Sequence, residues 1–213
     1  MKKIFLVSLL GLLILTIFSC KENPTEPIED GNCDSCAVVY KPNIYLYPTT
    51  AVELSVKIEF PSGGKVLKSI PEYNGLWNVQ VAPDGKINDE YAYLFYEAQM
   101  QDLMQKKCGW LVKKNDLKDF FQDNLSSSGF NEKEISDFTE YWVPKLNDFD
   151  YYEIYPQYKS TIDKMIKIIF SKSPDNFYRL FYFIKGRMDA DVSLDTPKIE
   201  KAERENFFVV ECL

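Results

Sequence analysis

Three ionisable residues stand in or at the end of apolar stretches, and their types could support chemistry. Glu97 lies within LFYEA, Arg179 within NFYRLFYF, and Glu211 within FFVVEC. A buried charge without a partner is very costly, so each group must pair or face water. Two carboxylates beside an arginine could form a hydrolase site, with one acid as proton donor and the other as base or nucleophile. The trio could equally be an internal ion pair that holds strands in register, or a polar anchor for a ligand.

The chain contains no histidine. This excludes Ser-His-Asp and Cys-His catalysis in their usual forms, and also HExxH and three-histidine zinc sites. The sequence shows no glycine-rich phosphate loop, because the SGG at 62–64 is typical of a turn. We therefore predict no cofactor, and any chemistry must use carboxylates, tyrosines, lysines, arginines or cysteines.

Aromatic residues are abundant, with 14 tyrosines and 15 phenylalanines. Exposed rings stack on sugars, so one hypothesis is a glycan-binding surface; the same rings could instead form the wall of a core, with tyrosine hydroxyls reaching solvent. The candidate binding residues are Trp77, Trp110, Tyr141 and Trp142.

The segment DADVSLD has oxygen-rich spacing that could hold calcium. Its acids are Asp189, Asp191 and Asp195. The segment lacks the glycine and the terminal glutamate of an EF-hand loop. These aspartates are therefore metal-ligand candidates without a supporting motif.

The elements that must position these residues follow from periodicity. The stretch 51–60, AVELSVKIEF, alternates apolar and polar residues and predicts a half-solvated antiparallel strand. Pro83 and Gly85 predict a turn after LWNVQV. Further strands are predicted at NIYLY, KVLKSI, LWNVQV, 91–98, 151–156, 164–171, 176–186 and the terminal NFFVVECL, while 187–205 is loop-like.

Two helices interrupt this series of strands. Leu117, Phe121 and Leu125 lie at helical spacing, which predicts a helix over 117–127 with Asp116 at its cap. Asn131 followed by Glu134 predicts the start of a second helix over 132–143. Strands, a two-helix hairpin and more strands, without βαβ alternation, predict one α+β domain in which the helix pair covers an antiparallel sheet.

The N-terminus has the pattern of a targeting segment. Lys2 and Lys3 precede an apolar run over 4–18, which is too short for a spanning helix and lacks the polar face of a core helix. The residues before Cys20 are similar to a loose bacterial lipobox, although Phe18 is bulkier than usual. This resemblance implies cleavage and lipidation at Cys20, and two or three acyl chains make a stable anchor. The alternative is an uncleaved N-terminal anchor.

The predicted organisation is a signal peptide over 1–19, a lipidated tether over 20–37 and a single domain over 38–213. The tether is rich in proline and acids and has too little apolar surface to fold. Lys21 and Glu22 resemble a charged surface-export signal of Bacteroidota lipoproteins. We expect a cell-envelope protein, anchored by lipid to the outer membrane and exposed at the surface.

Four cysteines remain besides Cys20, an even number that suggests pairing outside the cytoplasm. Cys33 and Cys36 form a C-x-x-C within the tether, without the helix start that would lower a thiol pKa. This favours a local disulfide over redox chemistry, and free thiols or pairing with Cys108 and Cys212 is the alternative. The net charge of −7 without a basic cluster argues against nucleic acid as a partner.

Several motifs occur in order from Lys41 to the C-terminus: KPNIYLYP, LWNVQVAPDG, YLFYEA, GFNEKEISDFTEYWVPKL, SPDNFYRLFYFIKG and FFVVEC. Together they resemble a family of uncharacterised secreted or lipid-anchored bacterial proteins, also seen in fungi. Its members share a KPVIYLYP start, an APDG turn, FWEG, YWxP and a terminal VVEWGG. This chain has FYEA in place of FWEG and lacks the terminal glycines. The resemblance implies the domain boundaries and no catalytic residues.

Two function hypotheses follow. The first is a non-enzymatic lipoprotein domain that binds a glycan, a peptide or a partner protein at the envelope. The second is a carboxylate-pair hydrolase of polysaccharide that uses Glu97 and Glu211. A purely structural envelope component would leave no trace in particular residues, and the sequence does not set the oligomeric state.

Overall fold

The computed structural model describes residues 36–213. The leader, Cys20 and Cys33 lie outside the described residues. The strands are β1 (Cys36–Val39), β2 (Asn43–Tyr47), β3 (Val52–Glu59), β4 (Gly64–Ile70), β5 (Trp77–Val81), β6 (Leu94–Gln101), β7 (Trp110–Lys113), β8 (Tyr151–Tyr158), β9 (Lys167–Phe170), β10 (Asn176–Arg187) and β11 (Phe208–Cys212). The α-helices are α1 (Leu117–Ser127), α2 (Glu132–Trp142) and α3 (Lys159–Met165), and the 3-10 helices are η1 (Lys114–Asp116) and η2 (Val143–Lys145).

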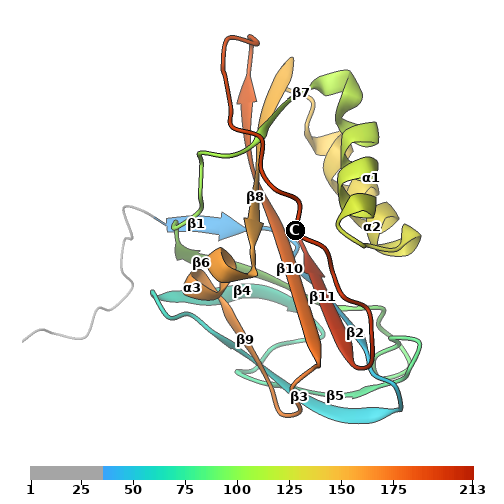
Figure 1. Cartoon of the computed structure of the whole chain (residues 1–213). Coiled ribbons are helices and arrows are strands. Elements are labelled where there is room, and N and C mark those ends of the chain that lie inside the picture. Colours follow the sequence, from blue (N-terminus) through green and yellow to red (C-terminus); the bar gives the residue numbers. More distant parts are fainter. Residues whose placement is uncertain (1–35) are drawn as a thin grey trace, which may run out of the picture. The chain divides into compact units, whose positions relative to one another are not determined.

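The strands form two sheets. The large sheet has eight strands in the order β1-β6-β2-β11-β10-β8-β7, with β4 also paired to β6, and the small sheet has the order β5-β3-β9. Figure 1 shows β8, β10 and β11 running side by side. All strand pairs among the described residues are antiparallel except β10–β11, which is parallel. A parallel pair needs a long connection, which residues 188–207 provide.

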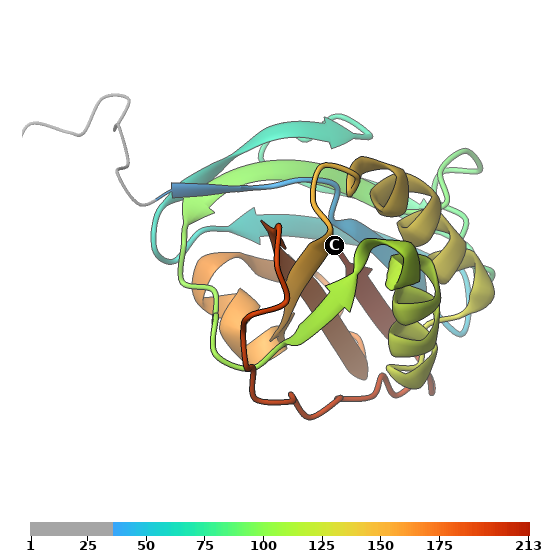
Figure 2. The same cartoon turned by 90° about the horizontal axis from the view of Figure 1, so that it is seen from above.

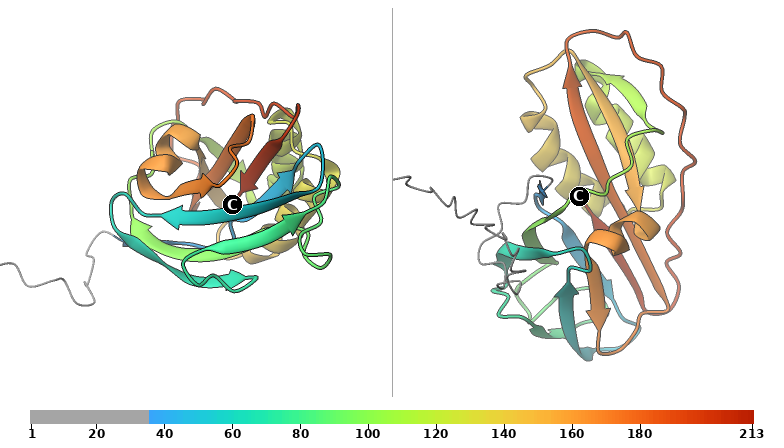
Figure 3. Two further views of the ribbon diagram at one scale, coloured as in Figure 1. Left: turned by 90° about the horizontal axis from the view of Figure 1, so that it is seen from below. Right: turned by 90° about the vertical axis from the view of Figure 1, so that its left-hand side faces the viewer.

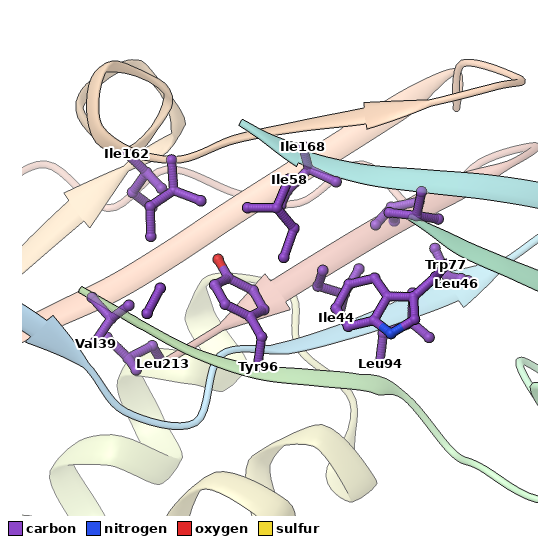
Figure 4. Packing of buried hydrophobic residues seen from close by; sticks show 14 of the residues in the cluster. Val39, Ile44, Leu46, Ile58, Trp77, Leu94, Tyr96, Ile162, Ile168 and Leu213 are labelled. Carbon is purple, nitrogen blue, oxygen red and sulfur yellow. The ribbon is translucent and has the colours of Figure 1, made fainter. Parts of the chain in front are cut away.

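One core lies between the two sheets. Ile44 and Leu46 on β2 pack in one buried cluster with Val56 on β3 and Trp77 on β5. Figure 4 shows that Tyr96 points from β6 into this cluster, which also includes Ile162 of α3. We call this cluster the inter-sheet core. It explains why β3 alternates so clearly in the sequence, since one of its faces meets the large sheet and the other meets water.

A second core lies between the large sheet and the helix pair. Tyr45, the residue between Ile44 and Leu46, faces this second cluster together with Phe121 of α1 and Phe138 of α2. We call it the helix-side core. Figure 2 shows α1 and α2 side by side along one side of the strands. Successive side chains of a strand point to opposite faces of the sheet. A central strand such as β10 has a core on each side, so it must be apolar on both faces.

The predicted helix hairpin is confirmed. Asn131 and Glu134 form a reciprocal capping box at the start of α2. Gly129 follows α1 with φ of +89°, a conformation that glycine adopts without steric cost. Asp116 occupies the N-cap position of α1, but its side chain makes no capping hydrogen bond.

The α+β fold class is as predicted, but several details differ, and the strands β1 and β7 were not predicted. The strand expected over 164–171 is the helix α3 followed by the short strand β9. Ile162 and Met165 are spaced three apart and both are completely buried, which favours a helical turn. The division into two sheets was also not predicted. Alternation of apolar and polar residues shows that one face of a strand is buried, but it does not show which element packs on that face.

The connecting segment 188–207 leads from the end of β10 back to the start of β11 (Figure 3). Tyr158 and Tyr178 donate hydroxyl hydrogen bonds of 3.0 and 2.9 Å to backbone carbonyls within it, at Lys198 and Glu200. Arg204 contacts Glu134 of α2 through both terminal nitrogens, at 2.9 and 3.0 Å. Side chains from the sheet and from the helix pair therefore hold an otherwise irregular segment.

Candidate functional site

The structure brings two of the three predicted ionisable residues together. Arg179 and Glu211 are direct partners in the parallel β10–β11 register, and the Arg179 Nε donates to Glu211 Oε2. Neither side chain is exposed at all. Arg179 Nη1 also donates to Asp163 Oδ1 at 2.8 Å and to the carbonyl of Ile166 at 2.5 Å. Tyr96 donates to the remaining carboxylate oxygen of Glu211 at 2.7 Å.

The surroundings of this pair keep the Arg179 guanidinium charged. Burial alone would lower the pKa of Arg179, but the adjacent Glu211 carboxylate holds that pKa above its usual range. Burial and the same carboxylate raise the pKa of Tyr96 well above 10, so its hydroxyl remains a donor. A sealed, hydrogen-bonded ion pair fixes the register of two strands and offers no open face to a substrate.

Glu97 does not join this pair. Tyr96 points into the inter-sheet core, so the next residue along β6 points to the opposite face of the sheet. There Glu97 lines an open cleft, whereas Glu211 is completely buried. A carboxylate-pair hydrolase needs both acids around one substrate bond. Glu97 and Glu211 do not have this arrangement.

The cleft that Glu97 lines is the best candidate for a functional site. It has a volume of about 450 Å³ and lies between the β4–β6 strand pair, the turn before β6 and helix α2. It combines aromatic walls with charges of both signs, which is the composition of many ligand sites. The lining residues are Lys41, Lys68, Ile70, Glu90, Tyr91, Ala92, Tyr93, Phe95, Glu97, Lys133, Asp137 and Tyr141. We call it the Glu97 cleft.

Three charged residues form a row across the strands of this cleft. Lys68 on β4 is the direct cross-strand partner of Glu97 on β6. On the other side of β6, Lys41 falls between the registered pairs Val39–Ala98 and Asn43–Phe95, which places it beside Glu97. Within residues 36–213, none of the three forms an ion pair at 4.0 Å or less. The row therefore presents two ammonium groups and one carboxylate that are outside these ion pairs.

Lys41 has an unusual backbone. Its φ is +59°, a region that lysine rarely adopts, and Pro42 follows it between β1 and β2. Its ammonium lies 4.1 Å from the centre of the Tyr141 ring, a cation–π contact. Burial lowers its pKa; the positive charge of Lys145 acts in the same direction, and Asp137 opposes both. Strained backbone is concentrated at functional sites, so this conformation supports a role for the cleft.

Asp137 of α2 is already engaged within the cleft. It accepts a hydrogen bond of 3.0 Å from the Tyr45 hydroxyl and pairs with Lys133 at 2.8 Å. Tyr93 packs edge-on against Tyr45, with ring centres 5.2 Å apart, and is half-buried. Asp137 therefore ties the helix to the sheet, which leaves Glu97 and the exposed Glu90 as the acids of the cleft that form no ion pair at 4.0 Å or less within residues 36–213.

The four predicted binding aromatics do not form one surface. Trp77 is 2% exposed in the inter-sheet core and donates to the carbonyl of Pro71. Trp110 is half-buried on β7, edge-on to Phe120. Trp142 lines a separate apolar hollow of about 280 Å³ beside β1.

Tyr141 alone among them reaches the Glu97 cleft, and Lys41 and Lys145 both lie 4.1 Å from its ring centre. Its ring is therefore already in contact with the chain's own cations. Lys41, Lys68 and Tyr93 were missed in the sequence because they resemble ordinary residues of strands and of the turns beside them.

The aspartates considered for calcium do not come together as a group of metal ligands. Asp189 pairs with Arg187 at 2.7 Å and accepts from the Asp191 backbone nitrogen at 3.1 Å. The backbone carbonyl of Asp195 accepts from Gly109. In the described part of the chain, no group of three or more cysteines, aspartates or glutamates is arranged to hold a metal ion.

The cysteines fall into two kinds. Cys36 is disulfide-bonded, and Cys33 lies outside the described residues. Cys108 and Cys212 are free thiols, half-buried and buried respectively. Burial raises the pKa of Cys212 well above its usual value, which keeps it unreactive.

No helix within residues 36–213 has both the length and the apolar character needed to cross a membrane. The chain matches no family model, no curated protein and no solved structure. Its function must therefore be argued from the geometry of the cleft.

Proposed function

We propose that this protein is a lipid-anchored, non-enzymatic domain that binds a glycan in the Glu97 cleft. The observation that carries the proposal is the row of Lys68, Glu97 and Lys41, in which three charged side chains without ion-pair partners face one open cleft beside the half-buried Tyr93. Unpaired charged groups at the surface of a pocket retain their capacity to bind a polar ligand.

A glycan fits this combination better than an apolar ligand. Sugar hydroxyls can donate to the Glu97 carboxylate and accept from ammonium groups, while the apolar face of a sugar ring packs on an aromatic side chain. Tyr93 and Phe95 supply aromatic surface within the same cleft. The cleft volume of about 450 Å³ lies within the range of about 300 to 1,000 Å³ that ligand sites generally span. The cleft therefore has room for a small number of sugar units.

The anchor part of the proposal rests on the sequence. A basic start, an apolar run over 4–18 and Cys20 followed by a polar tether are the features of a bacterial lipoprotein. We expect the wild-type protein to enter the detergent phase in Triton X-114 partition, and a Cys20→Ser variant to shift to the aqueous phase. Equal partition of both proteins would contradict the lipid anchor.

The binding part is tested on a glycan array with the purified full-length protein in detergent. Wild type is expected to bind at least one class of glycan, and Tyr93→Ala and Glu97→Gln to weaken that binding about tenfold, as expected for loss of a stacking or charge-assisted contact. Glu53→Gln, on the exposed side of β3, is the matched control and should bind as wild type. The proposal would be contradicted if wild type bound no glycan, or if Tyr93→Ala and Glu97→Gln bound glycans as tightly as wild type.

A further inference from the structure

We infer that the Glu97 cleft selects acidic sugars, with a sugar carboxylate held between Lys41 and Lys68. This inference rests on the proposed glycan-binding function and specifies its ligand. The relevant observation is the position of the two lysines on either side of Glu97, one on β4 and the other between β1 and β2.

Lysines are concentrated around this cleft, although Glu90, Glu97 and Asp137 line it as well. The protein carries a net charge of −7, yet four lysines gather around the cleft. Lys133 is neutralised by Asp137, and Lys145 lies on the Tyr141 ring at the rim. Among residues 36–213, Lys41 and Lys68 form no ion pair at 4.0 Å or less, although acids outnumber bases in the chain as a whole. A ligand carboxylate between Lys41 and Lys68 would gain two favourable charge contacts, against repulsion from Glu90 and Glu97.

Both lysines are held in place by aromatic rings. The Lys41 ammonium lies 4.1 Å from the Tyr141 ring centre, and the Lys68 ammonium lies 5.7 Å from the Phe95 ring centre. The unusual φ of Lys41 fixes the direction in which its side chain leaves the backbone. A pair of ammonium groups whose stems are already positioned loses less side-chain entropy when a carboxylate binds.

Glu97 explains why a sugar carboxylate fits better than a phosphate. Its own carboxylate lies in the same row, so a ligand that carries two negative charges would meet stronger repulsion than a singly charged one. Glu97 can at the same time accept hydrogen bonds from the sugar hydroxyls. A ligand with one carboxylate and several hydroxyls therefore satisfies all three members of the row.

The inference is tested by isothermal titration calorimetry of the full-length protein in detergent. The probes are matched pairs of oligosaccharides of equal length and linkage: galacturonate, glucuronate and sialylated forms, each with its neutral counterpart. We expect at least one acidic form to bind about tenfold or more tightly than its neutral partner at low salt, with an advantage that shrinks at 0.5 M salt.

Lys68→Gln removes one charge at an exposed position, and a Lys41→Gln, Lys68→Gln double variant removes both. Each should bring the ratio of the affinity for the acidic form to the affinity for its neutral counterpart down to about one. Lys172→Gln, at an exposed position outside the cleft, is the matched control and should retain the preference. Thermal unfolding of every variant shows whether the fold is intact.

The outcomes separate the two proposals. Equal affinity for acidic and neutral forms would overturn the acidic-sugar inference and leave glycan binding standing. A preference that survives in the folded double variant would overturn the assignment to Lys41 and Lys68. Absence of binding to any probe, together with an empty glycan array, would overturn both proposals.

Discussion

Tyr96 donates a hydrogen bond of 2.7 Å to Glu211 in the inter-sheet core, although the two residues are 115 positions apart in the chain. The residue after Tyr96, Glu97, faces the cleft on the other side of the same strand. One position along a strand therefore separates a residue that holds the core together from a residue available to a ligand.

The first prediction concerns the buried ion pair. Glu211→Gln leaves the Arg179 guanidinium with less compensation inside the core, where its side chain is completely buried. We expect a loss of about 3 to 5 kcal/mol in the free energy of unfolding. Urea unfolding followed by tryptophan fluorescence measures this, because Trp77 is buried in the same core.

Glu53→Gln is the control for this prediction and should change stability by less than about 0.5 kcal/mol, since Glu53 is exposed. An Arg179→Met, Glu211→Gln double variant should be less destabilised than the sum of its single variants, because the two residues interact. Strict additivity would show that the pair does not couple β10 to β11.

The second prediction concerns pH. Burial raises the pKa of Glu153, but hydrogen bonds from Tyr155 and Arg187 outweigh burial, so that pKa lies below its usual value. A carboxyl whose pKa is lowered in the folded state adds stability above its unfolded pKa of about 4.3, and loses that contribution as the pH falls through the folded value.

We therefore expect Glu153→Gln to be less stable than wild type at pH 7, with a difference that diminishes as the pH falls below about 4. Urea midpoints measured from pH 3 to pH 7 test this. A difference that stays constant over that range would show that ionisation of Glu153 does not contribute to stability.

The third prediction concerns the backbone at Lys41. Because φ is +59° there, Lys41→Gly should be more stable than Lys41→Ala by about 1 kcal/mol. Lys68 lies in the strand β4, and there the order should be reversed, with alanine more stable than glycine. Thermal unfolding of the four variants provides the comparison, and the same order at both positions would argue against strain at Lys41.

The fourth prediction concerns the connecting segment 188–207. Arg204 binds Glu134 through two nitrogens, a geometry that lysine does not reproduce. Arg204→Lys should therefore speed amide exchange at Ala202, whose N–H donates to the Ser128 carbonyl at 2.9 Å, by about tenfold. Lys201→Gln, at an exposed neighbouring position, should leave that exchange unchanged.

The sequence by itself determined the α+β class, the helix hairpin and most strands, because these depend on local patterns. Apolar residues at helical spacing and the Asn131–Glu134 capping box define α2 from a few neighbouring positions. The alternation in β3 likewise needs no information about its partner. The sequence also predicted that Glu97, Arg179 and Glu211 required partners or water, since burial of an isolated charge is prohibitive.

Only the tertiary structure decided which of these charges meet. Arg179 and Glu211 pair because β10 and β11 lie parallel in one register, a relationship that depends on a crossover of 20 residues and leaves no local signal. The Glu97 cleft depends on three separate segments, β4, the β1–β2 junction and α2, which contribute Lys68, Lys41 and Tyr141. Strand pairing between distant segments follows from the packing of the whole core, so the residues of a site built across several strands cannot be grouped from periodicity alone.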